Sequence, residues 1–77
     1  MSVYFSREYG RSSVLFENAE CSGESENAIY VVFEEDHEEH CIPKSQIHKD
    51  SDIREYGDTG NLIITRWIAE KRGLVED

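Results

Sequence analysis

The chain has 77 residues and a formal net charge of −9, so it has room for one domain, residues 1–77, and for no second core. The excess of carboxylates disfavours direct binding to nucleic acid or to an anionic membrane, because phosphate contacts require Lys and Arg. With 38% hydrophobic residues, the chain is expected to fold around one small core rather than to stay disordered.

The charge is distributed unevenly along the sequence. Between Ser12 and Pro43 there is no Lys or Arg, while nine carboxylates fall in this stretch. The eight basic residues lie toward the two ends of the chain. One face of the fold is therefore expected to be strongly negative.

The first third of the chain predicts two short strands. Ser2–Ser6 alternates weakly and is typical of a strand, and Tyr9–Ser12 contains the Gly of a turn. Ser13–Glu17 predicts a second strand that can continue towards Cys21. The polar run Ser22–Asn27 predicts a loop.

The middle of the chain predicts a hairpin. Ile29–Phe33 is β-branched and aromatic, which favours a central strand. The residues around Asp36–Glu38 predict the turn, and His40–Ile42 the returning strand. Pro43 lacks an N–H and is expected at the end of that strand, after which Ser45 is expected to cap one helical turn.

The last third begins with a polar stretch, His48–Gly60, in which Ile53 and Tyr56 are the expected anchors. Asn61–Thr65 then predicts the last strand. Thr65 is expected to cap a short helix containing Trp67.

The end of this helix has its own signals. Ile68 and Lys71 lie at helical spacing from the preceding tryptophan. Gly73 is placed as a left-handed C-terminal residue, and Leu74 is expected to fold back against the helix.

These elements predict a β-rich α+β fold, a small antiparallel β-meander or partly closed barrel of four to five strands with one short C-terminal helix. The candidate core consists of Val3, Phe5, Val14, Phe16, Ile29, Val31, Phe33, Ile42, Ile47, Leu62, Ile64, Trp67, Ile68 and Leu74.

The sequence also bears on location. It contains no export signal and no apolar run long enough to span a membrane. We therefore expect a cytoplasmic protein in which Cys21 and Cys41 are free thiols.

Three segments resemble a pattern found in short uncharacterised proteins of phages, prophages and plasmids. In that pattern I-P-K-S-Q-I follows an acidic hairpin, and a strand then leads into W-(I/L)-A-E-K-(K/R)-G-L. The matching segments here are Ile42–Ile47, the strand Ile63–Thr65 and Trp67–Leu74. The likeness covers about the last two-thirds of the chain, and Met1–Glu26 has no counterpart. This chain departs from the pattern at Cys41, because a tryptophan often precedes the I-P-K-S-Q-I segment in those proteins. The resemblance implies a fold and a mobile-element context, but no functional residues.

The small size and strong acidity are also similar, in type and not in motif, to anti-CRISPR proteins and other phage inhibitors of host nucleic-acid machinery. This similarity implies a protein partner inside the host cell, with a CRISPR surveillance complex as its most specific version.

The carboxylates around the predicted hairpin are the main candidate site. Residues two apart on a strand are about 6.6 Å from each other on one face, similar to the spacing of phosphates along a nucleic-acid strand. Such a surface can occupy a basic groove of another protein, or it can simply be a solvated edge that resists aggregation. The candidate partner-binding residues are Glu24, Glu26, Glu34, Glu35, Asp36, Glu38 and Glu39.

Other chemistry has weaker support. Zinc ligands are offered by Cys21, His37, His40, Cys41 and His48. Their spacing is poor and there is no C-x-x-C pair, so we expect no metal site and no other cofactor. A minor basic face for nucleic acid is offered by Lys44, Arg54, Arg66, Lys71 and Arg72. No run of aromatic residues accompanies these basic residues, and the global charge opposes such a role.

Catalysis is not expected. Cys41 and His40 are neighbours in sequence and therefore point to opposite faces of a strand. The carboxylates are crowded in solvent, with no apolar pocket to separate their pKa values.

The sequence favours a small, acidic, non-enzymatic binding protein of a mobile element that inhibits a host nucleic-acid-binding complex. The alternative is a structural or assembly module that binds through apolar edge strands. A homodimer formed through an edge strand is compatible with both.

Overall fold

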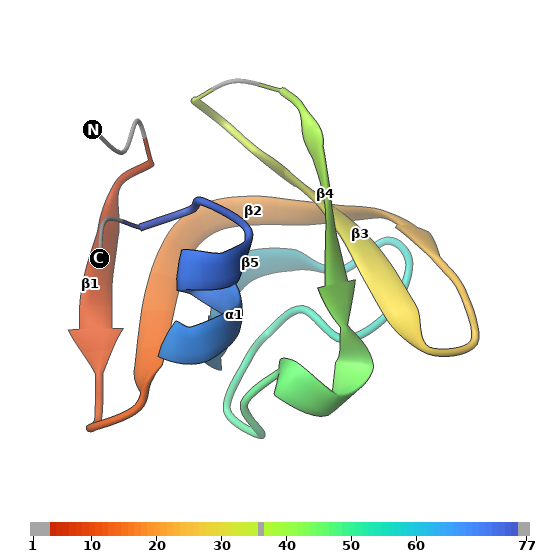
Figure 1. Ribbon diagram of the computed structural model, residues 1–77. Helices are drawn as coiled ribbons and strands as arrows, with labels where there is room; N and C mark the ends of the chain where they lie inside the picture. The colour runs from red at the N-terminus through yellow and green to blue at the C-terminus, as the bar shows by residue number, and fades with distance from the viewer. Residues whose placement is uncertain (1–3, 36, 76–77) are drawn as a thin grey trace.

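One long strand, β2 (Ser13–Glu24), organises the sheet in the computed structural model, which describes residues 4–35 and 37–75 (Figure 1). β2 pairs antiparallel with β1 (Ser6–Tyr9) through its first half. Through its second half it pairs antiparallel with β3 (Ala28–Phe33). These two partners share one edge of β2, because the other edge belongs to a fifth strand.

That fifth strand is β5 (Thr59–Thr65), which pairs antiparallel with both halves of β2. β4 (Glu39–Pro43) pairs antiparallel with the edge of β3 that does not pair with β2. The strand order is β1-β2-β3-β4, with β5 off this path. An antiparallel sheet with one short C-terminal helix is thereby confirmed. The sheet is not closed, and it is not a simple meander because β5 returns to β2 instead of following β4.

Two irregularities let β2 serve so many partners. Its register against β5 shifts between Phe16 and Ala19, where Asn18 has a left-handed backbone with φ 59°. Its register against β3 shifts between Cys21 and Gly23. Bulges of this kind bend and twist a strand, and Figure 1 shows β2 arching over the molecule.

Two expected boundaries in the N-terminal third were wrong. The first strand is Ser6–Tyr9, so it shares only Ser6 with the expected strand Ser2–Ser6, whose first two residues lie outside the described ones. Tyr9 pairs with Ser13 directly beside the turn that contains Gly10. The turn therefore sets the register between β1 and β2. The expected loop Ser22–Asn27 is shorter, because the bulge carries two of its polar residues into β2.

The short 3₁₀ helix η1 (Lys44–Gln46) follows β4 directly. Pro43 ends β4 as expected, but it also takes the N-cap position of η1, with φ −60°. Ser45 therefore lies inside the turn and does not cap it. Proline suits this boundary because it needs no N–H partner and its φ is already fixed.

The C-terminal helix α1 (Arg66–Lys71) has the expected ends. The hydroxyl oxygen of Thr65 accepts a hydrogen bond from the N–H of Ile68 at 3.3 Å. Gly73 has φ 73°, and Leu74 folds back into the core and donates its N–H to the helix. Of the helical segments in the described chain, the longest has six residues, far short of a membrane-spanning length.

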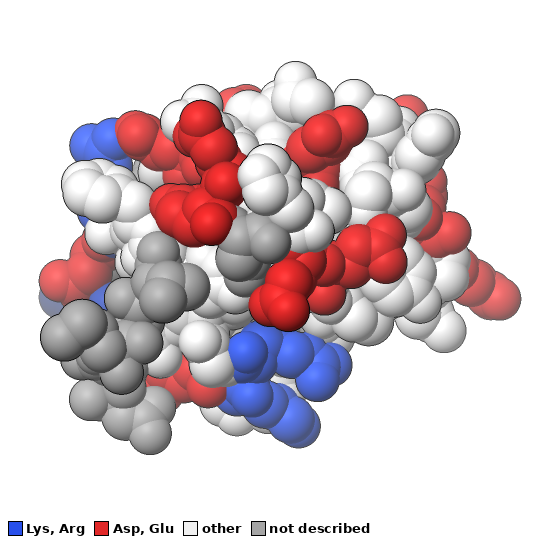
Figure 2. Space-filling view, turned by 90° about the horizontal axis from the view of Figure 1, so that it is seen from above, with Lys and Arg blue, Asp and Glu red and all other residues white. Residues whose placement is uncertain are grey.

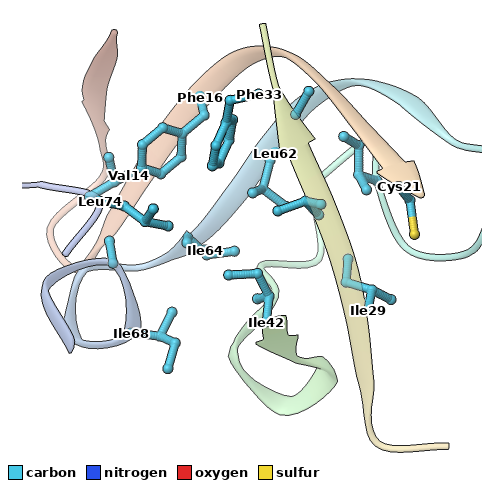
Figure 3. Close-up of a cluster of buried hydrophobic side chains, with 14 residues drawn as sticks. Val14, Phe16, Cys21, Ile29, Phe33, Ile42, Leu62, Ile64, Ile68 and Leu74 are labelled. Atoms are coloured by element: carbon cyan, nitrogen blue, oxygen red, sulfur yellow. The ribbon is translucent and has the colours of Figure 1, made fainter. Parts of the chain in front are cut away.

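The core lies between the curved sheet and α1 (Figure 3). Most of the predicted core is confirmed, and Ile47 packs partly buried against it. The prediction that Phe5 and Trp67 belong to the core was wrong, because they are 74% and 57% exposed. Val3 lies outside the described residues. The structure adds a set of buried residues that the sequence did not single out, namely Ala19, Cys21, Ile63 and Ala69.

The segment before β5 is anchored by one of its two expected residues. Ile53 is fully buried, whereas Tyr56 is 69% exposed. The buried hydroxyl of Ser51 accepts hydrogen bonds from the N–H groups of Ile53 (3.2 Å) and Ile63 (3.1 Å). It therefore fastens this segment to the edge of β5 that β2 leaves open.

Candidate acidic partner-binding surface

The net negative charge of the chain comes from one segment, which forms three adjacent strands and the loops between them. Residues 12–43 contain nine carboxylates and no Lys or Arg, and the other eight carboxylates are balanced by eight basic residues. This stretch forms β2, β3, β4 and their connections. Figure 2, viewed from the side of the β3–β4 hairpin tip, shows acidic side chains spread over this face with basic side chains at its border.

The strand register places two carboxylates on the outer face of the sheet. Val32 pairs with Glu20 of β2 on one side and with Glu39 of β4 on the other. Their sequence neighbours Val31 and Cys21 are buried, so this row faces away from the core. The Cα atoms of the two glutamates are two strand spacings apart, about 10 Å. Glu39 accepts a hydrogen bond from the hydroxyl of Ser22 at 2.7 Å.

The hairpin tip extends this negative surface. Glu34, Glu35 and Glu38 are all exposed, and Asp36 lies outside the described residues. The Glu35 carboxylate accepts a hydrogen bond from the backbone N–H of Phe5 at 3.0 Å. The tip is thus joined to the chain just before β1.

A shallow groove of about 370 Å³ runs beside the tip. The two described non-glycine residues with a left-handed backbone, Asn18 and His37, both line it. The other lining residues are Glu20, Val32, Phe33 and Glu34. The bend in β2 and the turn of the hairpin therefore meet at the same place on the acidic surface.

The predicted residues Glu24 and Glu26 lie elsewhere. They are at the other end of β3, which is about 17 Å long at 3.3 Å per residue. Glu24 bonds to the Lys44 ammonium at 2.8 Å and accepts the backbone N–H of Tyr56 at 3.2 Å. The Lys44 bond, followed by the Tyr56 N–H, holds the pKa of the Glu24 carboxyl below its usual value. Its charge is thus neutralised locally, while Glu26 is exposed in the β2–β3 turn.

We define the acidic face as Glu20, Glu34, Glu35, Glu38 and Glu39. No Lys or Arg in the described part of the chain forms an ion pair with four of its members, Glu20, Glu34, Glu35 and Glu39. Glu20 was not among the predicted partner-binding residues, although the second strand was expected to continue towards Cys21. Its place in the acidic face follows from the pairing of β2 with β3.

The candidate zinc ligands are dispersed. His40 lies at 3.0 Å from the hydroxyl of Tyr4, and His48 packs edge-on against the ring of Tyr9. Cys21 is buried, and this burial raises the pKa of its thiol, which keeps it protonated and unreactive. No three metal-binding side chains are grouped within the residues that the structure describes.

The basic residues are occupied by contacts within the chain. Lys44 pairs with Glu24, Arg54 donates to the carbonyl of His48, Arg66 pairs with Glu8, Lys71 lies over the ring of Trp67, and Arg72 donates to the carbonyl of Cys41. Three of them, Arg66, Lys71 and Arg72, belong to α1 or its C-cap, whereas Lys44 lies in η1 and Arg54 in the segment before β5.

A scan against known protein families, a search of curated proteins and a search of solved structures each found no match for this chain. The resemblance of Ile42–Ile47 and Trp67–Leu74 to phage and plasmid proteins therefore stays a prediction.

Proposed function

We propose that this chain is a non-enzymatic binding protein whose acidic face covers a basic, nucleic-acid-binding surface of another protein. The observation that carries the proposal is the acidic face itself. It combines carboxylates from two strands, β2 and β4, and from the hairpin tip between β3 and β4, and four of them have no Lys or Arg partner in the described chain.

Uncompensated charge in a fixed array favours a partner of opposite charge. The backbones of Glu20 and Glu39 are held on a paired sheet, so no main-chain ordering is needed there when a partner binds. Complementary charge also steers association, which gives fast binding and a strong dependence on salt. A nucleic-acid-binding groove has the required positive charge along an extended path.

A nucleic-acid-handling complex of a host cell is the partner class that we propose. The resemblance to phage and plasmid proteins supplies the mobile-element context, and the likeness in type to anti-CRISPR proteins makes a CRISPR surveillance complex the most specific version. In this version the protein acts as an inhibitor that competes with nucleic acid.

Assembly through apolar edge strands has less support. The outer edge of β4 is contacted by the Arg72 guanidinium, which donates to the carbonyl of Cys41 at 3.1 Å. At the other side of the sheet, β1 is four residues long and carries exposed Arg7 and Glu8. Charges on a short edge strand discourage pairing with another strand.

The proposal is tested by affinity capture from the lysate of a CRISPR-bearing host. Glu34→Lys with Glu39→Lys reverses two charges of the acidic face. Glu55→Lys with Glu70→Lys makes the same change in net charge outside it. Wild type and the second variant are expected to retain a nucleic-acid-handling complex that salt and added nucleic acid release, and the first variant is expected to lose it.

Equal capture by the two variants would refute the role of the acidic face. Capture that persists at high salt would favour the assembly module instead. Circular dichroism of both variants verifies that the charge changes leave the fold intact.

A further inference from the structure

A second groove, of about 660 Å³, lies away from the acidic hairpin tip. It is formed between α1, η1 and the β1–β2 turn, of which η1 and the turn lie at the bottom of Figure 1 while the hairpin tip lies at the top. Its principal lining residues are Arg11, Gln46, Thr65, Arg66 and Trp67. This volume suits a short peptide segment rather than a whole domain.

Trp67 is the only tryptophan of the chain, and the fold does not bury it. Its side chain is 57% exposed, with the Lys71 ammonium 4.8 Å from the ring centroid. The core of α1 is supplied by Ile68 and Ala69 instead. A large exposed indole beside arginines is the composition found at the energetic centres of protein interfaces.

The groove also has cationic groups available for a carboxylate. The Arg11 guanidinium has no ion-pair or hydrogen-bond partner in the described chain. Arg66 lies 3.3 Å from a carboxylate oxygen of Glu8, whose side chain is 75% exposed. Exposed pairs of this kind contribute little, so an incoming carboxylate can share or replace the contact.

We propose that this groove binds an acidic segment of a partner protein, in which a single carboxylate lies next to an apolar side chain. The carboxylate pairs with Arg11 and Arg66, and the apolar side chain covers the exposed ring of Trp67. Glu70 lines the same groove and repels further negative charge, which favours an isolated carboxylate over the repeated phosphates of a nucleic acid. This inference is independent of the acidic face.

The test uses the ¹⁵N-labelled full chain, whose single tryptophan gives one indole N–H signal. The probes are blocked pentapeptides G-X-D-Z-G, in which X and Z are phenylalanine, leucine or tyrosine. At least one is expected to shift the indole signal saturably, with a Kd below about 1 mM. Replacing its aspartate with asparagine is expected to weaken binding at least about fivefold.

The variant Arg11→Ala with Arg66→Ala is expected to weaken binding of that peptide at least about tenfold. Arg7→Ala, which removes an exposed arginine paired with Glu17 outside the groove, is expected to leave it unchanged. Four results would each overturn the proposal. They are an indole signal that no peptide shifts, equal binding of the asparagine peptide, tighter binding of a single-stranded oligonucleotide, and an indole shift that depends on protein concentration alone.

Discussion

The buried hydroxyl of Ser51 is predicted to contribute more to stability than its size implies. Ser51 accepts hydrogen bonds from the N–H groups of Ile53 and Ile63, and its proton lies within reach of the carbonyls of Ile53 (3.2 Å) and Asn61 (3.4 Å). Ser51→Ala removes the acceptor and leaves two buried N–H groups without a partner.

The magnitude follows from those two donors. A buried donor left unsatisfied costs about 1–3 kcal/mol, so the loss of both contacts in Ser51→Ala is expected to lower the free energy of unfolding by about 2–6 kcal/mol. A 77-residue domain has a total stability of about 4–11 kcal/mol. One hydroxyl therefore accounts for a large part of the stability of the fold.

Urea denaturation followed by circular dichroism measures this effect. With a slope of about 1 kcal/mol per molar urea, the midpoint is expected to fall by about 2 M or more. Ser45→Ala is the matched control, because Ser45 is exposed in η1 and is expected to change the free energy of unfolding by less than about 0.5 kcal/mol. If the two variants lost equal stability, the assignment of Ser51 as the anchor of β5 would be wrong.

Two further predictions concern the Glu24–Lys44 ion pair and the first residues of β5. Lys44→Met is expected to return the pKa of Glu24 towards its ordinary value of 4.5, measured by NMR titration, because the ammonium is the main cause of the lowering. Since the folded pKa is depressed, the contribution of Glu24 to stability is present above pH 4.5 and is lost as the pH falls through the folded value. An unchanged pKa in the variant would exclude this pair as the cause. Gly60→Ala is expected to destabilise the fold by about 1–3 kcal/mol in thermal unfolding, because φ is +128° and its Cβ would lie 3.0 Å from the carboxylate of Asp52. Gly57→Ala, with φ +94° and no atom within 4 Å of its Cβ, has backbone strain alone, and an equal loss in both would show that the contact is unimportant.

The elements that depend on neighbouring residues were predictable from the sequence. The capping of α1 by Thr65, the left-handed Gly73 and the returning Leu74 all act within a few positions of each other. The β3–β4 hairpin was predictable for the same reason, because two strand-like runs flank a polar turn.

The exposure of individual side chains was less predictable. Phe5 and Trp67 have the same apolar character as core residues, but burial depends on whether another element covers them. Ala19 and Cys21 are small and gave no periodic signal, yet the bend of β2 carries both into the core. Bulges depend on pairing with distant strands, so the continuation of β2 beyond Cys21 to Glu24 was not visible in its own sequence.

In the candidate site, too, features set by neighbouring residues were predictable and features set by distant parts of the chain were not. The carboxylates of the hairpin tip were evident as a local run of charge. Glu20 joins them only through the pairing of β2 with β3. Glu24 is compensated by Lys44, twenty positions along the chain, which local composition does not reveal.

The proposed function requires that the acidic face occupies a surface of the partner that otherwise binds nucleic acid. Its most direct test is a competition measured by fluorescence anisotropy, with labelled nucleic acid bound to the complex that the protein captures. The wild-type chain is expected to displace the nucleic acid, with an inhibition constant that weakens at least about tenfold between about 50 and about 300 mM salt. Glu34→Lys with Glu39→Lys is expected to abolish displacement, while Glu55→Lys with Glu70→Lys preserves it. Binding of the protein and the nucleic acid to the complex at the same time, without competition, would contradict the claim.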